Sequence, residues 1–158
     1  KEQKMDKRIK ICKEEAEKQI QAFKDNCGFE DPKEIVSGES SIPEEYRILF
    51  LSGVMTGVIE FREDFKRIAV NLRAPIKTKD GDISEISVQP HRIKQHEVRG
   101  IKAKLAEQAK SSKTEVDEGD VLEKTGQKLF ELSDYVLSEM CTKDTQAMTA
   151  VTVHLVFI

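Results

Sequence analysis

The sequence predicts a single α+β domain over residues 1–158, in which about four helices pack on a small antiparallel sheet. Three observations lead to this prediction. A hairpin with one apolar face occupies residues 66–89, segments with a helical apolar period lie on both sides of it, and the chain ends on a run of β-forming residues. A length of 158 residues suits one domain with its own core.

Residues 1–27 have the pattern of an amphipathic helix. Apolar or small residues recur every three or four positions in one stripe, and Lys, Glu and Gln fill the other positions. We expect the stripe to pack against the protein's own core, with dimerisation through it as the alternative. Cys12 falls on the stripe and is expected to be a small buried thiol. Gly28 is expected to cap the helix.

A connector rich in Asp, Glu, Pro, Gly and Ser follows at residues 28–41, with one short helical turn expected at 32–36. The sequence Ser-Ile-Pro-Glu at 41–44 resembles a capping box and predicts the start of a second helix. Two alternatives stay open for residues 52–61. Either the helix continues, with two glycines on one face that another element can approach closely, or it ends and a strand follows.

The hairpin itself alternates in polarity. Apolar residues occupy every second position from 68 to 76, and Ile86 belongs to the apolar face of the returning strand. A three-residue loop at 80–82 places Ile76 opposite Ile86, whereas a two-residue loop mixes the two faces, so we expect three residues. Pro75 cannot donate to a ladder, and its strand is therefore expected at an edge or bulged at that point.

Two more helices are predicted after the hairpin, at about residues 92–109 and 121–140. The C-terminal stretch 148–158 alternates β-branched and apolar residues with Thr and His, which is typical of a strand. An apolar strand left unpaired promotes aggregation. We therefore expect this stretch to pair with the hairpin and complete a three-stranded sheet.

Charge is unevenly distributed along the chain. Residues 65–110 carry 11 basic and 5 acidic side chains, a net charge of +6, whereas residues 25–64 carry −7 and residues 111–158 carry −5. Either these blocks neutralise each other within the fold, or the basic block faces an acidic partner. Four cations between residues 92 and 110 lie within about a quarter turn of each other on a helix. They form the predicted interaction face: Arg92, Arg99, Lys102 and Lys110.

The composition argues against a membrane span and against a zinc site. The longest mostly apolar run, 48–59, is interrupted by Ser, Gly and Thr and is too short to cross a bilayer. The three cysteines, at 12, 27 and 141, are far apart and lack a C-x-x-C pair. We expect reduced thiols in a cytoplasmic or nuclear compartment, and no cofactor.

No catalytic signature, metal-binding motif or phosphate-binding loop is present in the sequence. It therefore favours a non-enzymatic protein–protein interaction or assembly module whose partner is a protein with an acidic surface. One alternative is an enzyme whose site is assembled from scattered residues, and the candidates are Glu60, Glu63, His91 and His154. A second alternative is nucleic-acid binding through the 66–110 basic block, which the acidic net charge and the lack of exposed aromatics on the hairpin disfavour.

Overall fold

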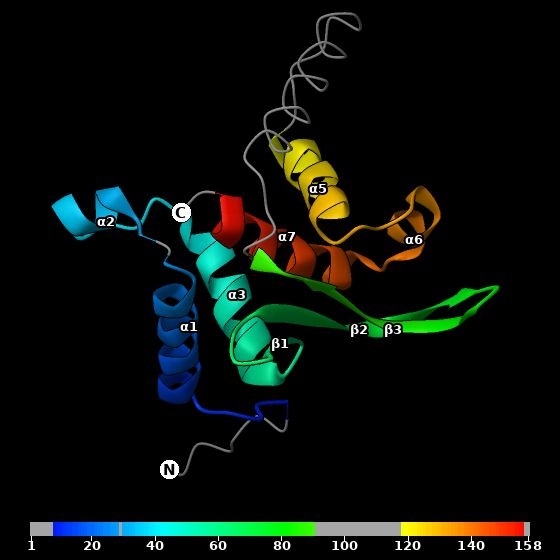
Figure 1. Cartoon of the computed structure of the whole chain (residues 1–158), viewed down its shortest axis with the longest axis horizontal. Helices are drawn as coiled ribbons and strands as arrows, with labels where there is room; N and C mark the ends of the chain where they lie inside the picture. The colour runs from blue at the N-terminus through cyan, green and yellow to red at the C-terminus, as the bar shows by residue number, and fades with distance from the viewer. Residues whose placement is uncertain (1–7, 29, 91–117, 157–158) are drawn as a thin grey trace, which may run out of the picture.

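The computed structural model describes residues 8–28, 30–90 and 118–156, which have an α+β fold with a three-stranded antiparallel sheet (Figure 1). The predicted fold class is confirmed, although this described part holds six helices rather than about four. In chain order the elements are α1 (Lys13–Cys27), α2 (Pro32–Ser37), α3 (Glu44–Thr56), β1 (Ile59–Arg62), β2 (Arg67–Thr78), β3 (Gly81–Val88), α5 (Glu118–Leu129), α6 (Asp134–Glu139) and α7 (Thr142–Val156).

The third strand of the sheet is β1, and not the C-terminal stretch. The strands lie in the order β1-β2-β3, and each pairs antiparallel with the next. The predicted C-terminal strand is wrong over its described part, because α7 runs to Val156. Every residue from Ala147 to Leu155 except Thr149 is buried. A helix buried on all sides has no polar face to reveal its 3.6-residue period, so its sequence can resemble that of a strand.

The register of β2 and β3 also differs from the prediction. The loop between them holds two residues, 79–80, and Ile76 lies opposite Ile83 rather than Ile86. Further along, the register shifts, because four residues of β2 between Asn71 and Ile76 oppose one residue of β3. The predicted register assumed that each residue of one strand opposes one residue of the other. The bulge places extra residues in β2 and breaks this one-to-one pairing.

Asp144 at the start of α7 holds this bulge. Its carboxylate is fully buried and accepts hydrogen bonds from the backbone N–H of Arg73, at 3.0 Å to each oxygen, and of Ala74, at 3.2 Å. The strand of Pro75 was expected to lie at an edge of the sheet or to be bulged at that point. It is bulged, and β2 is the central strand of the sheet. Ala74 is exposed, contrary to the predicted apolar face.

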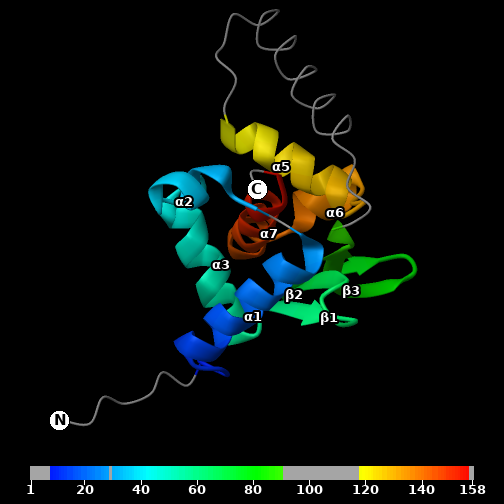
Figure 2. The same cartoon turned by 60° about the vertical axis from the view of Figure 1, so that its left-hand side comes forward.

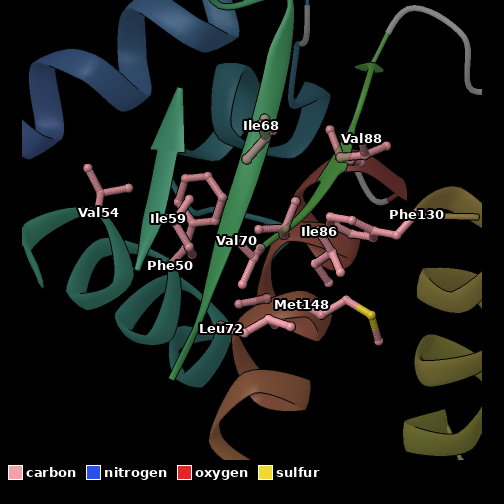
Figure 3. Packing of buried hydrophobic residues seen from close by; sticks show 14 of the residues in the cluster. Phe50, Val54, Ile59, Ile68, Val70, Leu72, Ile86, Val88, Phe130 and Met148 are labelled. Carbon is pink, nitrogen blue, oxygen red and sulfur yellow. The ribbon is translucent and has the colours of Figure 1, made fainter. Parts of the chain in front are cut away.

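One face of the sheet packs on α3 and α7 and forms the core. The inward side chains of all three strands meet Phe50 of α3 and Met148 of α7, both almost fully buried (Figure 3). The strand residues labelled in this core are Ile59, Ile68, Val70, Leu72, Ile86 and Val88. The predicted apolar face of the returning strand is therefore confirmed.

The N-terminal helix is shorter than predicted. Residues 8–12 are not helical, since the backbone N–H groups of Lys10 and Ile11 donate to the carbonyl oxygen of Met55 at 2.8 and 3.2 Å. Cys12 is exposed rather than buried, because it precedes the first turn of α1. From there on the stripe packs on α3 and β1, and Phe23 stacks on Phe61 with ring centroids 5.1 Å apart.

The glycine-capped end of α3 resolves the two alternatives for the stretch at 52–61. Helix α3 continues to Thr56, Gly57 adopts a left-handed conformation with φ 76°, and β1 follows. Gly53 is where another element approaches closely, because a Cβ there would lie 2.5 Å from the side chain of Ile59. Gly28 caps α1 as predicted, with φ 68°.

The predicted capping box at 41–44 is wrong, although α3 does begin at Glu44. The hydroxyl of Ser41 donates to Asp31 at 2.6 Å, and Pro43 occupies the N-cap position. The short helical turn expected in the connector is confirmed as α2.

The helix predicted at 121–140 is two helices, α5 and α6. Glu131 has a positive φ of 55°, which interrupts the helix after Leu129. Ser133 then caps α6, and its hydroxyl oxygen accepts a hydrogen bond from the N–H of Val136 at 3.2 Å. The sequence did not reveal this interruption, because buried residues on both sides of it, Phe130 and Val136, continue the apolar pattern. The helix predicted at 92–109 lies outside the described residues.

Candidate interaction surface

The sheet face that points away from α7 is polar, and a network of side chains crosses all three strands. Arg62 of β1 lies 2.9 Å from the carboxylate of Glu85 on β3 and 3.7 Å from that of Glu60. The side-chain amide of Asn71 on β2 donates to Glu60 at 2.6 Å and to the carbonyl of Gly57 at 2.8 Å. These charges are partly exposed, so each pair contributes at most about 1 kcal/mol to stability. The network keeps this face polar.

Arg67 extends the network towards β3. Its Nη1 donates to the hydroxyl of Ser87 at 3.0 Å, while its Nε lies 3.7 Å from Glu63, beyond hydrogen-bond distance. This buried Nε finds no hydrogen-bond partner among the described residues. The result is a positive charge fixed beside β3.

The direction of the backbone groups in β2 follows from one hydrogen bond. The N–H of Asn71 donates to the carbonyl of Val58 at 2.7 Å, so Asn71 directs its backbone towards β1. Successive residues of a strand direct their backbone groups to opposite sides. Val70 therefore faces β3 and forms a hydrogen-bonded pair with Ile86, which lies opposite it.

β3 consequently directs some backbone groups away from the described sheet. Glu85 and Ser87, on either side of Ile86, direct their N–H and C=O groups away from β2. In the described sheet β3 pairs with β2 alone, so these groups lie on an open edge. We refer to the outward backbone of Glu85 and Ser87 as the β3 edge. An open edge is a template for pairing with another strand.

A hollow of about 740 Å³ runs along the β3 edge. One wall is β3 itself, and the other is the corner at residues 128–132 that joins α5 to α6. Figure 3 shows Phe130 of this corner beside Ile86 and Val88. The lining combines apolar side chains with charged ones: Arg67, Ile83, Glu85, Ile86, Ser87, Val88, Gln89, Lys128, Leu129, Phe130, Glu131 and Leu132.

Hydrogen bonds around the corner at residues 128–132 fix its conformation. The N–H of Leu132 donates to the carbonyl of Gln127 at 2.8 Å, and the side-chain amide of Gln127 donates back to Leu132 at 3.2 Å and to Asp134 at 2.7 Å. Phe130 is buried at the same place. The hollow is therefore bounded by a strand on one side and by a fixed turn on the other.

Titratable groups proposed for an enzyme do not converge in the described structure. Glu60 lies on the polar face and Glu63 in the turn that follows β1. His154 lies in the core, where its ring stacks on Phe50 with centroids 4.1 Å apart and its Nδ1 donates to the carbonyl of Ala150 at 2.7 Å. Burial lowers the pKa of His154 from 6.5 to about 4. This histidine is a neutral core residue.

The predicted interaction face, formed by Arg92, Arg99, Lys102 and Lys110, lies outside the described residues, as does His91. It stays a prediction. The described basic residues of the 66–110 block divide into two kinds. Arg67 is engaged with Ser87, whereas the side chains of Lys66, Arg73, Lys77 and Lys79 are exposed.

The β3 edge was not recognised in the sequence. The sequence indicated the returning strand and paired the C-terminal stretch with the hairpin, but it did not decide which strand of the hairpin keeps a free edge. The signal that could have corrected this is the alternation of Val58 to Arg62, where Ile59 and Phe61 face inward and Glu60 faces outward. This segment contains β1, which pairs with β2 on the side opposite to β3 and completes the three-stranded sheet.

The described residues contain no group of three or more His, Cys, Asp or Glu side chains placed to hold a metal ion. Among the described helices, none has the length and apolar character needed to cross a membrane. No family model, no curated protein and no solved structure matches the chain.

Proposed function

We propose that this protein is a non-enzymatic protein–protein interaction module that receives an extended segment of a partner at the β3 edge. The observation that carries the proposal is the outward backbone of Glu85 and Ser87 beside a hollow with apolar lining. Both features are needed, because main-chain hydrogen bonds supply affinity and side-chain pockets supply specificity in strand addition.

The sheet has two different faces, and this difference defines the segment that fits. Side chains of an added strand alternate between the faces. Those on the core side meet Phe130 and Leu132 in the hollow, and those on the other side meet Arg67 and Glu85. The expected segment therefore alternates apolar and polar residues, with both charges tolerated on the polar side.

The basic stretch suggests a second property of the partner. Arg92 follows the end of β3 by four residues in the sequence, and the 65–110 block carries a net charge of +6. We propose that the partner has an acidic surface, as the sequence predicts. We place the interaction in a reducing compartment, cytoplasmic or nuclear, because the three cysteines are free thiols.

The β3 edge can be tested with a matched pair of variants. Ser87→Pro removes the outward N–H, and proline is tolerated where a strand's N–H faces away from its ladder. Ser87→Ala loses the same contact between the Ser87 hydroxyl and Arg67 but keeps the N–H. Extended peptides would be selected from a displayed library of short random sequences on the wild-type chain. We expect Ser87→Pro to bind them about ten-fold or more weakly than Ser87→Ala, as measured by fluorescence anisotropy.

The same peptides should slow the exchange of the Glu85 and Ser87 amide hydrogens when bound. Equal affinity for Ser87→Pro and Ser87→Ala, at equal thermal stability, would show that strand addition at this edge does not occur. Selection of no peptide that depends on β3 would have the same meaning.

The predicted basic face has its own test. Arg92→Glu combined with Arg99→Glu should leave the melting temperature nearly unchanged, because exposed pairs are worth at most about 1 kcal/mol each. Co-purifying partner proteins should be retained by the wild type at low salt, released at high salt, and lost in the double variant. A large drop in melting temperature with partners retained would make these arginines structural. Nucleic acid in the retained material would favour the nucleic-acid alternative.

A further inference from the structure

The carboxylate of Asp31 closes a loop that contains α2, at the end of the molecule opposite to the tip of the hairpin. Asp31 accepts hydrogen bonds from the backbone N–H of Ser41 at 2.7 Å, from the Ser41 hydroxyl at 2.6 Å and from the Ser40 hydroxyl at 3.4 Å. The bonds from the Ser41 hydroxyl and N–H hold the pKa of Asp31 below its usual value. We call residues 31–41, which these bonds close into one loop, the α2 loop.

The α2 loop presents apolar side chains to solvent. All six residues of α2 are exposed, and 70% of Ile35 and 87% of Val36 is accessible. Figures 1 and 2 show α2 projecting from the body of the domain, at the opposite end from the tip of the hairpin. Two adjacent β-branched residues are poor helix formers and gain nothing from burial here. Their presence on a closed loop is not explained by folding.

The surroundings of these apolar residues are acidic. Residues 30–41 contain four carboxylates, those of Glu30, Asp31, Glu34 and Glu39, against the one cation of Lys33. A hollow of about 230 Å³ between α1 and α2 is lined by Asp25, Glu30, Asp31 and Glu34 together with Ile35, Gln21 and Lys24. Such a surface repels nucleic acid and anionic lipid, which leaves a protein as the complementary partner.

We infer that the α2 loop is a second docking element, which packs Ile35 and Val36 against an apolar segment of a different protein that also carries Lys or Arg. The carboxylates around the loop attract those cations, and one basic side chain of the partner enters the hollow between α1 and α2. The Asp31 bonds hold the loop closed before binding, which lowers the entropy cost of association. This surface is separate from the β3 edge.

The test uses short random peptides displayed on phage. Peptides are selected on the full chain and counter-selected on the double variant Ile35→Ser, Val36→Ser. The peptides that remain should combine Lys or Arg with large apolar residues. We expect the double variant to bind them about ten-fold or more weakly than the wild type with an unchanged melting curve, because both side chains are exposed. Raising the salt concentration should weaken binding to the wild type.

Two further variants separate the contributions. Glu34→Gln keeps the apolar side chains and should reduce both the affinity and its salt dependence. Asp31→Ala removes the bonds to Ser40 and Ser41 and should weaken binding about three-fold or more while Ile35 and Val36 remain. Ser87→Pro is the control for the β3 edge, and it should bind these peptides as the wild type does, so failure of either proposed surface is recognised separately.

Three outcomes would overturn the inference. The first is that no selected peptide depends on Ile35 and Val36. The second is that the dependent peptides are acidic or neutral. The third is that the wild-type chain sediments as a dimer which the double variant dissociates, since the occupant would then be a second copy of this chain.

Discussion

Asp144→Ala is expected to lower the free energy of unfolding by about 2 to 6 kcal/mol, because it leaves two backbone donors without an acceptor and each costs about 1 to 3 kcal/mol. The carboxylate is fully buried and takes the N–H groups of Arg73 and Ala74 at 3.0 to 3.2 Å. Its place in the first turn of α7 also lets the helix dipole favour a negative charge. Urea unfolding at neutral pH measures the loss.

Two controls accompany this variant. Asp144→Asn keeps the shape and one acceptor oxygen, so we expect a smaller loss. Asp82→Ala removes an exposed carboxylate from the same hairpin and should change the stability by no more than about 0.5 kcal/mol. The amides of Arg73 and Ala74 should also exchange faster in Asp144→Ala. A loss below about 1 kcal/mol would mean that the bulge does not depend on this carboxylate.

Asp144 also bears on the candidate surface. The bulge that it holds sets the register between β2 and β3, and that register decides which β3 residues direct their backbone to the free edge. In Asp144→Ala we therefore expect weaker binding of peptides selected at the β3 edge, even under conditions in which the protein remains folded.

Lowering the pH from 7 to 5 is expected to remove about 2 kcal/mol of stability through His154 alone. Burial, the largest cause, lowers the pKa of this ring to about 4 in the folded state, and the charges of Lys24 and Arg47 act in the same direction. The unfolded ring titrates near 6.5. Acid therefore protonates the unfolded chain first, so the stabilisation is complete above pH 6.5 and is lost as the pH falls towards 4.

The measurement compares urea unfolding of the wild type with that of His154→Phe at pH 7, 6 and 5. Phenylalanine keeps a ring to stack on Phe50 but cannot titrate. The other titrating groups are common to both proteins, so the difference between the two pH profiles isolates His154. Parallel profiles would show that the buried ring does not lose its proton affinity on folding.

Short sequence signals predicted the structural features that depend only on neighbouring residues. Gly28 ends α1 because glycine accepts the left-handed conformation at no steric cost, and the connector contains one short helix that begins with proline. The hairpin, with Ile86 inward, follows from its alternation. The α+β class follows because the chain contains both the 3.6-residue period of amphipathic helices and the two-residue period of strands.

The candidate surface was predicted only in part, for a reason that concerns the whole sheet. The returning strand was evident, but its free edge depends on which strand pairs on the far side of β2. β1 takes that place, shortly after α3, and the C-terminal stretch does not. The polarity pattern of a strand does not say which other strand it joins. The basic face at Arg92 and Arg99 rests on the sequence alone.

The sequence by itself determined the amphipathic N-terminal helix and the alternating hairpin, because a polar face imposes a period on each of them. The tertiary structure decided the rest. The segment at 148–156 is helical although its polarity alternates, and from Met148 to Leu155 every residue except Thr149 is buried, so no polar period marks the helix. The hairpin register depends on the carboxylate of Asp144, about 70 residues away from the N–H groups that it accepts. Contacts of that separation exist only once the chain has folded, so no local pattern records them.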